Sequence, residues 1–286
     1  MSDTASSATA RALGPISAVA ATVTVAGMIA TPLAPARSPR RRVLSSVVVG
    51  AMSALTTANA ARRWGPRRAL GAAAVTAGVT GVVERFGTAT GFPFGRYDYS
   101  AALRPQLAHV PVIVPLAWFA MGVPSREAAH AALGESSSTA GRVALGAAAM
   151  TAWDLFLDPQ MVAEGYWSWQ RRGRYRGIPV SNYLGWFLTS AALMALFERL
   201  LPVARAGSTD PPAGTERAPA SAAAPVSAGA ADVRLVGQYG YVSVMQTVGF
   251  ARFFRDPLVA AVGGAAMLPT SIAAARRVLI GRGVHR

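Results

Sequence analysis

Apolar stretches alternate with short polar segments along the whole chain. About eight of these stretches approach the ~20 apolar residues that a helix needs to cross the hydrocarbon core of a bilayer. They cover residues 14–33, 43–61, 69–86, 110–123, 142–158, 180–201, 235–253 and 257–275. Glycine, proline and arginine gather between them and mark the expected turns. The pattern predicts an all-α fold, a polytopic membrane helical bundle with about seven or eight transmembrane helices.

The first stretch has a second interpretation. Arg11 precedes it, and Ala34-Pro35-Ala36 follows with the small-x-small form of a signal-peptide cleavage site. Cleavage there would leave seven helices. The length of this stretch and the further spans after it favour a retained helix, and both interpretations stay open.

The polar segments divide the chain into five parts. Residues 1–13 are small and polar and are expected to form a disordered tail, and residues 14–201 form a membrane core of six spans with the motif-bearing loops. Residues 202–234 are rich in Ala, Pro and Ser, cannot bury enough apolar surface to offset the entropy of ordering, and are expected to be a disordered linker. Residues 235–275 hold two further spans, and residues 276–286 form a basic tail.

Composition supports a membrane protein and narrows its chemistry. Hydrophobic residues make up 52% and charged residues 14% of the chain, against about 25% charged in soluble domains. The net charge of +15 comes from arginines scattered between apolar spans, a pattern that indicates contact with anionic lipid headgroups rather than nucleic acid. Both sets of alternating loops carry similar numbers of arginines, so the positive-inside rule gives no orientation.

Several kinds of catalytic site are excluded or disfavoured. The chain has 0 cysteines, which rules out a thiolate nucleophile, an iron–sulfur cluster and a cysteine zinc site. The histidines, at positions 109, 130 and 285, lie far apart and form no histidine box, which argues against a di-iron hydroxylase or desaturase. We therefore expect no metal site.

Carboxylates at the end of an apolar helix are the most informative polar residues. Asp154 and Asp158 share one helix face at i, i+4 spacing. Apolar surroundings and a like charge nearby both favour the protonated carboxyl, the form that a general acid requires. Pro159 is expected to end this helix at Asp158. The alternative is an interfacial pair neutralised by arginines at positions 171, 172, 174 or 176. Glu84 is a third candidate acid, or else a salt-bridge partner.

If the spans simply alternate, these acids and two aromatic segments lie at one membrane face. Glu84, residues 87–99, residues 158–179 and the turn at 252–256 would all converge there. Aromatic residues in such segments usually form interfacial belts, but ring faces gathered around a proton donor can also stabilise a carbocation. A DxxxD pair is typical of polyprenyl transferases that bind magnesium diphosphate, yet the second aspartate-rich motif of those enzymes is absent.

Six ordered motifs carry a resemblance to a known family. They are TGFPFGRYDY (90–99), VPVIVPLAWFAM (110–121), AWDLFLDPQMV (152–162), GYWSW, GRYRGIP and SNYLGW (181–186). Together they resemble the integral-membrane carotenoid biosynthesis proteins that act as carotenoid hydratases, the group of the bisanhydrobacterioruberin and γ-carotene 1′-hydratases. The resemblance covers about residues 84–198. The terminal spans and the Ala/Pro linker match nothing specific.

The resemblance implies a hydro-lyase of the cytoplasmic membrane that adds water to the terminal double bond of an acyclic carotenoid, giving a tertiary alcohol without a cofactor. Asp154 or Asp158 would donate the proton, and the partner carboxylate would orient the water and take its proton. The substrate-binding candidates are Phe94, Tyr97, Tyr99, Trp118, Trp153, Trp167, Asn182 and Trp186. Among them Trp153, Tyr97 and Trp167 would stabilise the cation, and Asn182 would hold the water. Phe94, Trp118 and Trp186 would line the polyene tunnel.

Two other functions stay open at this point. The same scaffold could serve a different membrane isoprenoid enzyme, such as a prenyl transferase, isomerase or cyclase. It could also serve a non-catalytic carotenoid-binding protein, which would not depend on the two aspartates.

Overall fold

The computed structural model describes residues 2–202 and 231–283, and this part of the chain contains eight α-helices. Their bounds are α1 Ser2–Ala30, α2 Pro39–Trp64, α3 Pro66–Thr90, α4 Ile113–Leu133, α5 Thr139–Glu164, α6 Val180–Leu200, α7 Val233–Arg252 and α8 Pro257–Gly283, with a 3₁₀ turn, η1, at Thr31–Leu33. Each helix overlaps one predicted apolar stretch. The prediction of an all-α polytopic bundle is confirmed.

Several helices extend beyond the predicted bounds. α1 begins at Ser2, so it includes residues that we expected to form a disordered tail. α8 continues to Gly283 through much of the expected basic tail. Alanine is frequent in the first flank and arginine in the second. Both residues have high helix propensity, so a helix formed in the apolar segment extends into its flank. The expected linker lies mostly outside the described residues, and α7 begins at Val233.

Pro159 does not end α5, contrary to the prediction, because the helix continues to Glu164. A proline inside a helix leaves the carbonyl four residues earlier without its usual donor. Here that carbonyl belongs to Leu155, and Tyr175 Oη donates to it at 2.8 Å. The donor from outside the helix replaces the missing bond. Asp158 therefore lies inside a continuous helix rather than at its end.

A second proline, Pro115, does not interrupt a helix either. This proline lies in the first turn of α4, where a missing N–H is tolerated. The proline inside α4 is Pro124, which frees the carbonyl of Ala120. That carbonyl accepts hydrogen bonds from Thr56 Oγ1 at 2.9 Å and from Gln238 Nε2 at 3.0 Å. Side chains of α2 and α7 thus complete the backbone hydrogen bonding of α4 and fix these three helices together.

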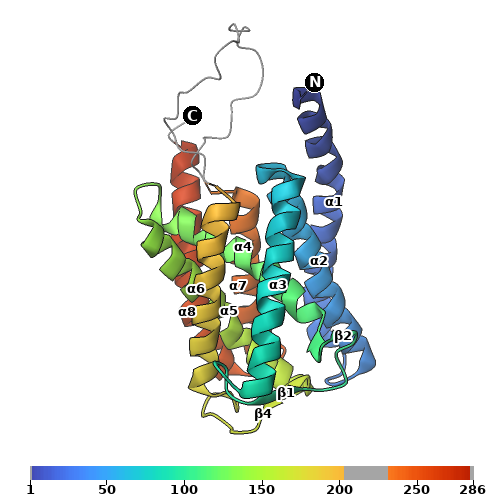
Figure 1. Cartoon of the computed structure of the whole chain (residues 1–286). Coiled ribbons are helices and arrows are strands. Elements are labelled where there is room, and N and C mark those ends of the chain that lie inside the picture. Colours follow the sequence, from blue (N-terminus) through green and yellow to red (C-terminus); the bar gives the residue numbers. More distant parts are fainter. Residues whose placement is uncertain (1, 203–230, 284–286) are drawn as a thin grey trace, which may run out of the picture.

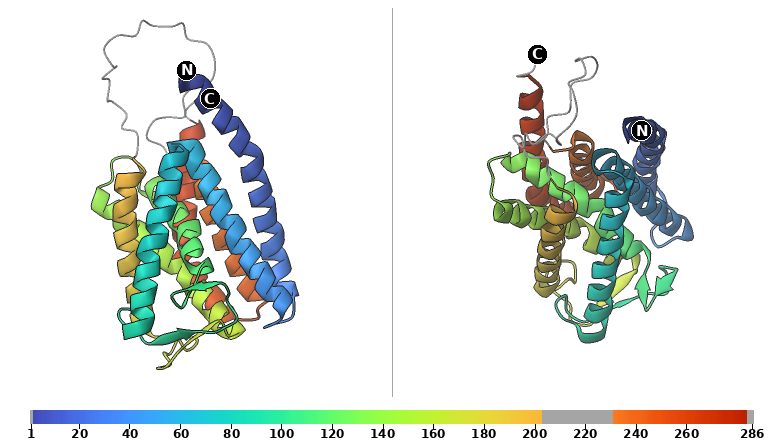
Figure 2. Two further views of the ribbon diagram at one scale, coloured as in Figure 1. Left: turned by 45° about the vertical axis from the view of Figure 1, so that its right-hand side comes forward. Right: turned by 45° about the horizontal axis from the view of Figure 1, so that its top comes forward.

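α4 is the central helix of the bundle (Figure 1 and Figure 2). It packs against α2, α3, α5, α7 and α8, and most of its side chains are buried. α1 packs mainly along α2 at the periphery. Two short antiparallel ribbons lie at the end of the bundle where α3 and α5 finish and α6 begins. They pair β1 (Tyr97–Tyr99) with β4 (Trp167–Trp169) and β2 (Gln106–Leu107) with β3 (Val110–Pro111).

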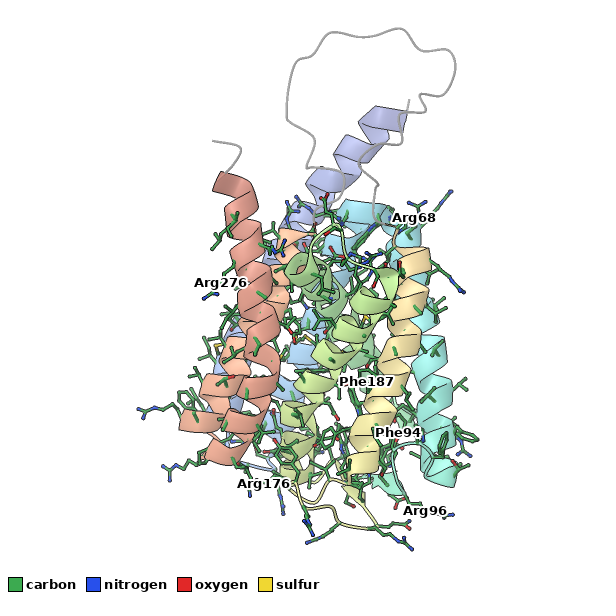
Figure 3. The ribbon with its side chains drawn as sticks, turned by 90° about the vertical axis from the view of Figure 1, so that its left-hand side faces the viewer. Arg68, Phe94, Arg96, Arg176, Phe187 and Arg276 are labelled. Carbon is green, nitrogen blue, oxygen red and sulfur yellow. The ribbon has the colours of Figure 1, made fainter. Side chains whose placement is uncertain are left out.

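The outer surface is suited to a lipid bilayer. Five of the described helices are long and apolar enough to cross a membrane, namely α1 (from Leu13, with η1), α2, α3, α6 and α8. Arginines stand at both ends of the bundle, such as Arg68 and Arg276 at one end and Arg96 and Arg176 at the other, while Phe187 lies in the band between (Figure 3). An apolar band between two basic ends is the surface of a multi-pass membrane protein.

A cluster of buried charges lies at the end of the bundle opposite the ribbons. Arg126 Nη1 contacts Glu127 Oε1 at 2.6 Å, and Arg126 Nε contacts Glu198 Oε1 at 3.0 Å. Arg126 Nη2 also donates to the carbonyl of Leu201 at 2.7 Å, and Glu127 Oε2 accepts the backbone N–H of Asp232 at 2.7 Å. The cluster therefore ties the end of α6 and the start of α7 to α4.

Candidate active site

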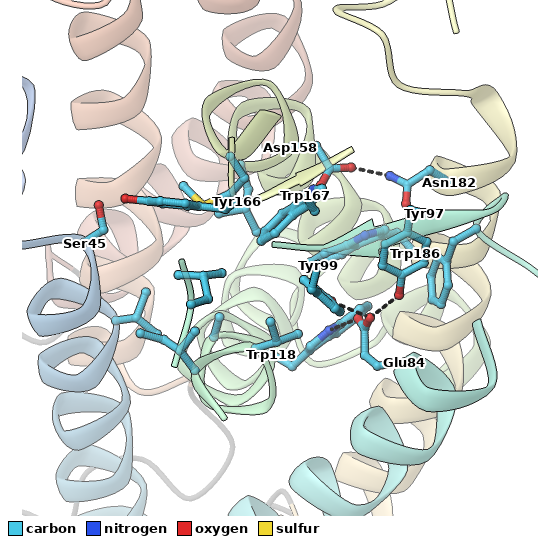
Figure 4. A pocket seen from close by; sticks show the side chains of 18 of the residues that line it. Ser45, Glu84, Tyr97, Tyr99, Trp118, Asp158, Tyr166, Trp167, Asn182 and Trp186 are labelled. Carbon is cyan, nitrogen blue, oxygen red and sulfur yellow. Dashed lines mark hydrogen bonds between the residues drawn. The ribbon is translucent and has the colours of Figure 1, made fainter. Parts of the chain in front are cut away.

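A cavity of about 80 Å³ lies near the ribbon end of the bundle (Figure 4). Side chains from α2, α3, α4, α5 and α6 form its walls together with the β1–β4 ribbon and the segments beside it. Its apolar and aromatic lining is Val49, Phe94, Tyr97, Tyr99, Leu103, Ile113, Val114, Ala117, Trp118, Leu157, Met161, Tyr166, Trp167, Trp169 and Trp186. The polar groups are Ser45, Ser46, Glu84, Asp158 and Asn182. A mostly apolar cavity with few polar groups is typical of a small-molecule site.

Glu84, on the α3 wall of the cavity, accepts hydrogen bonds from several side chains. It lies about 9 Å before the end of α3, from the helical rise per residue, and it is 4% exposed. Three donors converge on its carboxyl group, as Figure 4 shows: Tyr97 Oη, Tyr99 Oη at 2.7 Å and Trp118 Nε1 at 3.2 Å. Hydroxyl and indole groups that all donate to one carboxyl stabilise its ionised form.

The β1–β4 ribbon supplies aromatic rings to the cavity. Alternate side chains of a strand point to opposite faces, so the ribbon directs four rings to one side, those of Tyr97, Tyr99, Trp167 and Trp169. The intervening residues, Asp98 and Ser168, are exposed. Cross-strand pairing brings the rings of Tyr97 and Trp169 to 5.7 Å between centroids and those of Tyr99 and Trp167 to 5.6 Å. The Tyr-x-Tyr and Trp-x-Trp patterns are thus the inward faces of two paired strands.

Two glycines allow Phe94 to sit between α3 and α6. A Cβ atom at Gly87 would lie 2.8 Å from the Phe94 ring, and one at Gly185 would lie 2.5 Å from it. Both distances are shorter than a side-chain contact allows, so the ring fills the space that these glycines leave. Trp169 Nε1 donates to the carbonyl of Phe94 at 3.1 Å. These contacts fix the start of the ribbon against the two helices.

Asp158 meets the amide of Asn182 on another wall of the cavity (Figure 4). Asp154 contacts the same amide. Asn182 Nδ2 donates to Asp158 Oδ2 at 2.5 Å and to Asp154 Oδ2 at 3.0 Å. Trp167 Nε1 donates to Asp158 Oδ1 at 3.0 Å. Asp154 Oδ1 is buried and receives no hydrogen bond from the described residues. One amide group therefore joins both carboxyls of α5 to α6.

No arginine neutralises these acids within the described part of the chain. Glu84, Asp154 and Asp158 form no ion pair there. All four arginines that were candidates are exposed, and Arg176 pairs with Asp256 at 2.5 Å. Among residues 2–202 and 231–283 no group of three His, Cys, Asp or Glu side chains could hold a metal ion.

Stacked indoles form a further aromatic wall. The rings of Trp118 and Trp186 are stacked with centroids 3.9 Å apart, and Trp153 meets Trp186 edge to face at 6.3 Å.

All the candidate site residues from the sequence line the cavity except Asp154 and Trp153, which lie behind its wall. Sequence reasoning did not select four further polar or aromatic lining residues: Ser45, Ser46, Tyr166 and Trp169. The Trp-x-Trp alternation places Trp169 on the same face as Trp167 once the segment is known to be a strand, but the local sequence does not specify that strand. The serines carry no such signal.

Burial keeps the two ribbon tyrosines neutral. It raises the pKa of Tyr97 above its usual value, and the neighbouring Glu84 carboxylate raises it further. The same two causes raise the pKa of the Tyr99 hydroxyl. Both hydroxyls therefore remain hydrogen-bond donors to Glu84 at physiological pH.

These observations define a multi-pass membrane protein with an acidic, aromatic cavity between its helices. The chain belongs to the carotenoid biosynthesis protein family, whose model matches residues 42–224, more than half of the chain. It is also similar to the bisanhydrobacterioruberin hydratase of Haloarcula japonica, with 33% identity over 118 residues. That match covers 41% of this chain and 40% of the relative, so it spans less than half of either. No solved structure matches the chain. The resemblance found in the sequence motifs is thus confirmed for the family.

Proposed function

We propose that this protein is a carotenoid hydratase of the cytoplasmic membrane. It would act as a hydro-lyase that adds water to the terminal C=C of an acyclic carotenoid end group and yields a tertiary alcohol. The observation that carries this proposal is Asp158, a carboxyl that is 2% exposed, faces an aromatic cavity and has no cationic partner among the described residues. The family membership and the hydratase relative support the same chemistry.

The aspartate pair supplies the proton. An isolated alkene is a weak base, so its protonation needs a carboxylic acid that is kept away from water. Asp154 and Asp158 both contact one nitrogen of Asn182, and two carboxyls this close cannot both be ionised without a large cost. One of them retains a proton. Asp158 lines the cavity and Asp154 does not, so Asp158 is the donor to the substrate.

The aromatic walls stabilise the tertiary cation that forms. Tyr97 and Trp167 line the cavity, and each ring face that approaches a cation can contribute about 0.5–2 kcal/mol. Trp153 supports this wall from behind through Trp186. Asn182 uses its amide nitrogen for the aspartates, which leaves its carbonyl oxygen to orient the attacking water.

The cavity suits one end of a long apolar molecule. Its volume of about 80 Å³ is enough for a branched end group but not for a whole polyene, whose remainder would extend between the helices toward the lipid. Phe94, Trp118 and Trp186 line the cavity and would contact the polyene beside the reacting end. Water addition needs no redox change or activated co-substrate, so the proposed reaction uses no metal, nucleotide or redox cofactor.

Expression in a lycopene-producing host grown in ¹⁸O-labelled water tests the proposal. The pigment should gain the mass of one labelled water for each hydrated end. A variant with both Asp154→Asn and Asp158→Asn should accumulate to the same level in the membrane and leave lycopene unchanged. Label that enters only from O₂ would refute the hydratase. Unchanged product mass would instead indicate an isomerase or cyclase, divalent-metal dependence a prenyl transferase, and full function of the double variant a carotenoid-binding protein.

A further inference from the structure

We infer that Glu84 takes the proton from the attacking water, on a different wall of the cavity from the aspartate that protonates the alkene. This inference rests on the proposed hydratase function and divides its two proton transfers between two carboxyl sites. Glu84 is thereby a catalytic base rather than a third acid.

The two carboxyl sites share one cavity but no hydrogen-bond donors. Glu84 belongs to α3 and accepts from two tyrosines of β1 and from Trp118 of α4. Asp158 belongs to α5 and accepts from Trp167 of β4 and from Asn182 of α6. Figure 4 shows the two groups on different walls, with aromatic side chains beside them. A substrate end group in the cavity would therefore meet an acid and a base from different directions.

Their surroundings favour opposite protonation states, because Asp158 has a carboxyl neighbour and Glu84 has hydrogen-bond donors alone. All three partners of Glu84 donate hydrogen bonds to it, which suits a carboxylate. Asp158 also accepts two hydrogen bonds, from Trp167 and Asn182. It differs from Glu84 in that a second carboxyl, Asp154, shares its amide nitrogen, so one carboxyl of this pair keeps a proton. In one reaction the acid must be protonated while the base is ionised. Two carboxyls in different surroundings can hold these two states at the same pH.

The other candidate base is less well placed. Asp154 does not line the cavity, and Asn182 joins it to Asp158. Its position allows it to act on Asp158 through the shared amide, but not to face a water that attacks a cation inside the cavity. Glu84 Oε2 accepts both tyrosine hydroxyls, whereas Oε1 accepts only the indole of Trp118 at 3.2 Å among the described residues. Oε1 therefore has a lone pair for that water.

The step balances without another reactant. The O–H bond of Asp158 breaks, the π electrons of the alkene form a C–H bond, and the tertiary carbon becomes a cation. A lone pair of the water oxygen then forms the C–O bond, and Glu84 accepts the released proton. That proton returns to the aspartate pair through water in the cavity. After the product leaves, the cavity of about 80 Å³ exceeds the ~10–15 Å³ that one water requires, so water can carry this proton.

Deuterium exchange separates the two proton transfers. Membranes that contain the full-length protein are incubated with lycopene in D₂O, and both hydrated product and deuterium in recovered lycopene are measured. Glu84→Gln should reduce hydration by about 100-fold or more, the usual contribution of a general base. It should still exchange deuterium into the terminal group within about tenfold of the wild-type rate, because protonation and its reversal remain. Asp158→Asn should lose both hydration and exchange.

Two further variants make the test decisive. Glu84→Asp keeps a carboxylate and should hydrate faster than Glu84→Gln, which a merely structural role for this side chain does not predict. Glu135→Gln, at an exposed position, is the matched control and should behave as the wild type. Wild-type hydration in Glu84→Gln, or loss of exchange together with hydration, would overturn the inference. A wild-type protein with neither hydration nor exchange would refute the proposed function instead.

Discussion

Asp154 and Asp158 are adjacent on one helix face, yet only Asp158 lines the cavity. We therefore expect Asp158→Asn to lower hydration by about 10²–10⁴-fold, the range for a lost general acid. Asp154→Asn should lower hydration by about tenfold, because this residue acts through Asp158 and the shared Asn182 amide. The measurement is the hydrated fraction of pigment per unit of membrane protein. Equal losses in the two variants would contradict the assignment of Asp158 as the donor.

The ribbon tyrosines give a second prediction, for alkaline pH. Tyr99 has a pKa raised by burial and by Glu84, so the folded protein holds this proton more tightly than the unfolded chain does. Its contribution to stability is complete below the usual tyrosine pKa of about 10 and is lost as pH rises beyond it. The Tm in detergent should fall above pH ~10, and less steeply in Tyr99→Phe. Identical slopes would argue against a raised pKa.

Some site residues were visible in the sequence for a physical reason. Glu84, Asp154 and Asp158 interrupt apolar helices, where a carboxyl is costly and therefore conspicuous. Trp169 and Tyr166 were not selected, because an aromatic residue beside a membrane helix is usually part of an interfacial belt. The direction in which these two side chains point depends on strand pairing and on how the segment after α5 folds. Local sequence specifies neither.

Within α5, Pro159 and Tyr175 form a testable pair. Tyr175→Phe removes the donor to the Leu155 carbonyl and should lower the free energy of unfolding by about 1 kcal/mol. In a Pro159→Ala background the same change should cost almost nothing, because alanine at that position supplies the backbone N–H that proline lacks. Thermal unfolding of the four variants in a double-mutant cycle measures the coupling. Equal costs in both backgrounds would show that Tyr175 stabilises something else.

Helices were predicted better than their ends or the strands. Each apolar stretch identified a helix. A segment that crosses lipid must be apolar over about 20 residues, and it must satisfy its own backbone hydrogen bonds, as an α-helix does. The end expected at Pro159 was wrong because a side chain from a later segment replaces the lost bond. Tyr97 pairs with Trp169 although α4 and α5 lie between them in the chain, so the ribbon depends on the packing of α3, α5 and α6. Three-residue strands have no local pattern that reveals such a pairing.

Two groups of carboxyls at opposite ends of the molecule have different surroundings. Arg126 Nη1 lies 2.6 Å from Glu127 Oε1, and Arg126 Nε lies 3.0 Å from Glu198 Oε1. Glu84 and Asp158 have no such partner within the described residues. Paired buried charges support the fold, because removal of one partner leaves the other uncompensated. Unpaired carboxyls lower stability and are retained where chemistry requires them.

This contrast predicts that stability and activity can be separated by one substitution at each end. Arg126→Met leaves Glu127 with Arg63 at 3.7 Å as its remaining ion-pair partner among the described residues, whereas Glu198 keeps Arg142 and His130. The substitution should lower the free energy of unfolding by about 3 kcal/mol, while the protein that remains folded keeps its rate of hydration. Asp158→Asn removes a buried acid and should leave the Tm unchanged or raise it, while hydration is lost. Both quantities are measured on the same detergent-solubilised samples, as Tm and as product per folded protein. A fall in Tm for Asp158→Asn as large as that for Arg126→Met would mean that the cavity carboxyl holds the helices together, and the case for Asp158 as a proton donor would lose its physical basis.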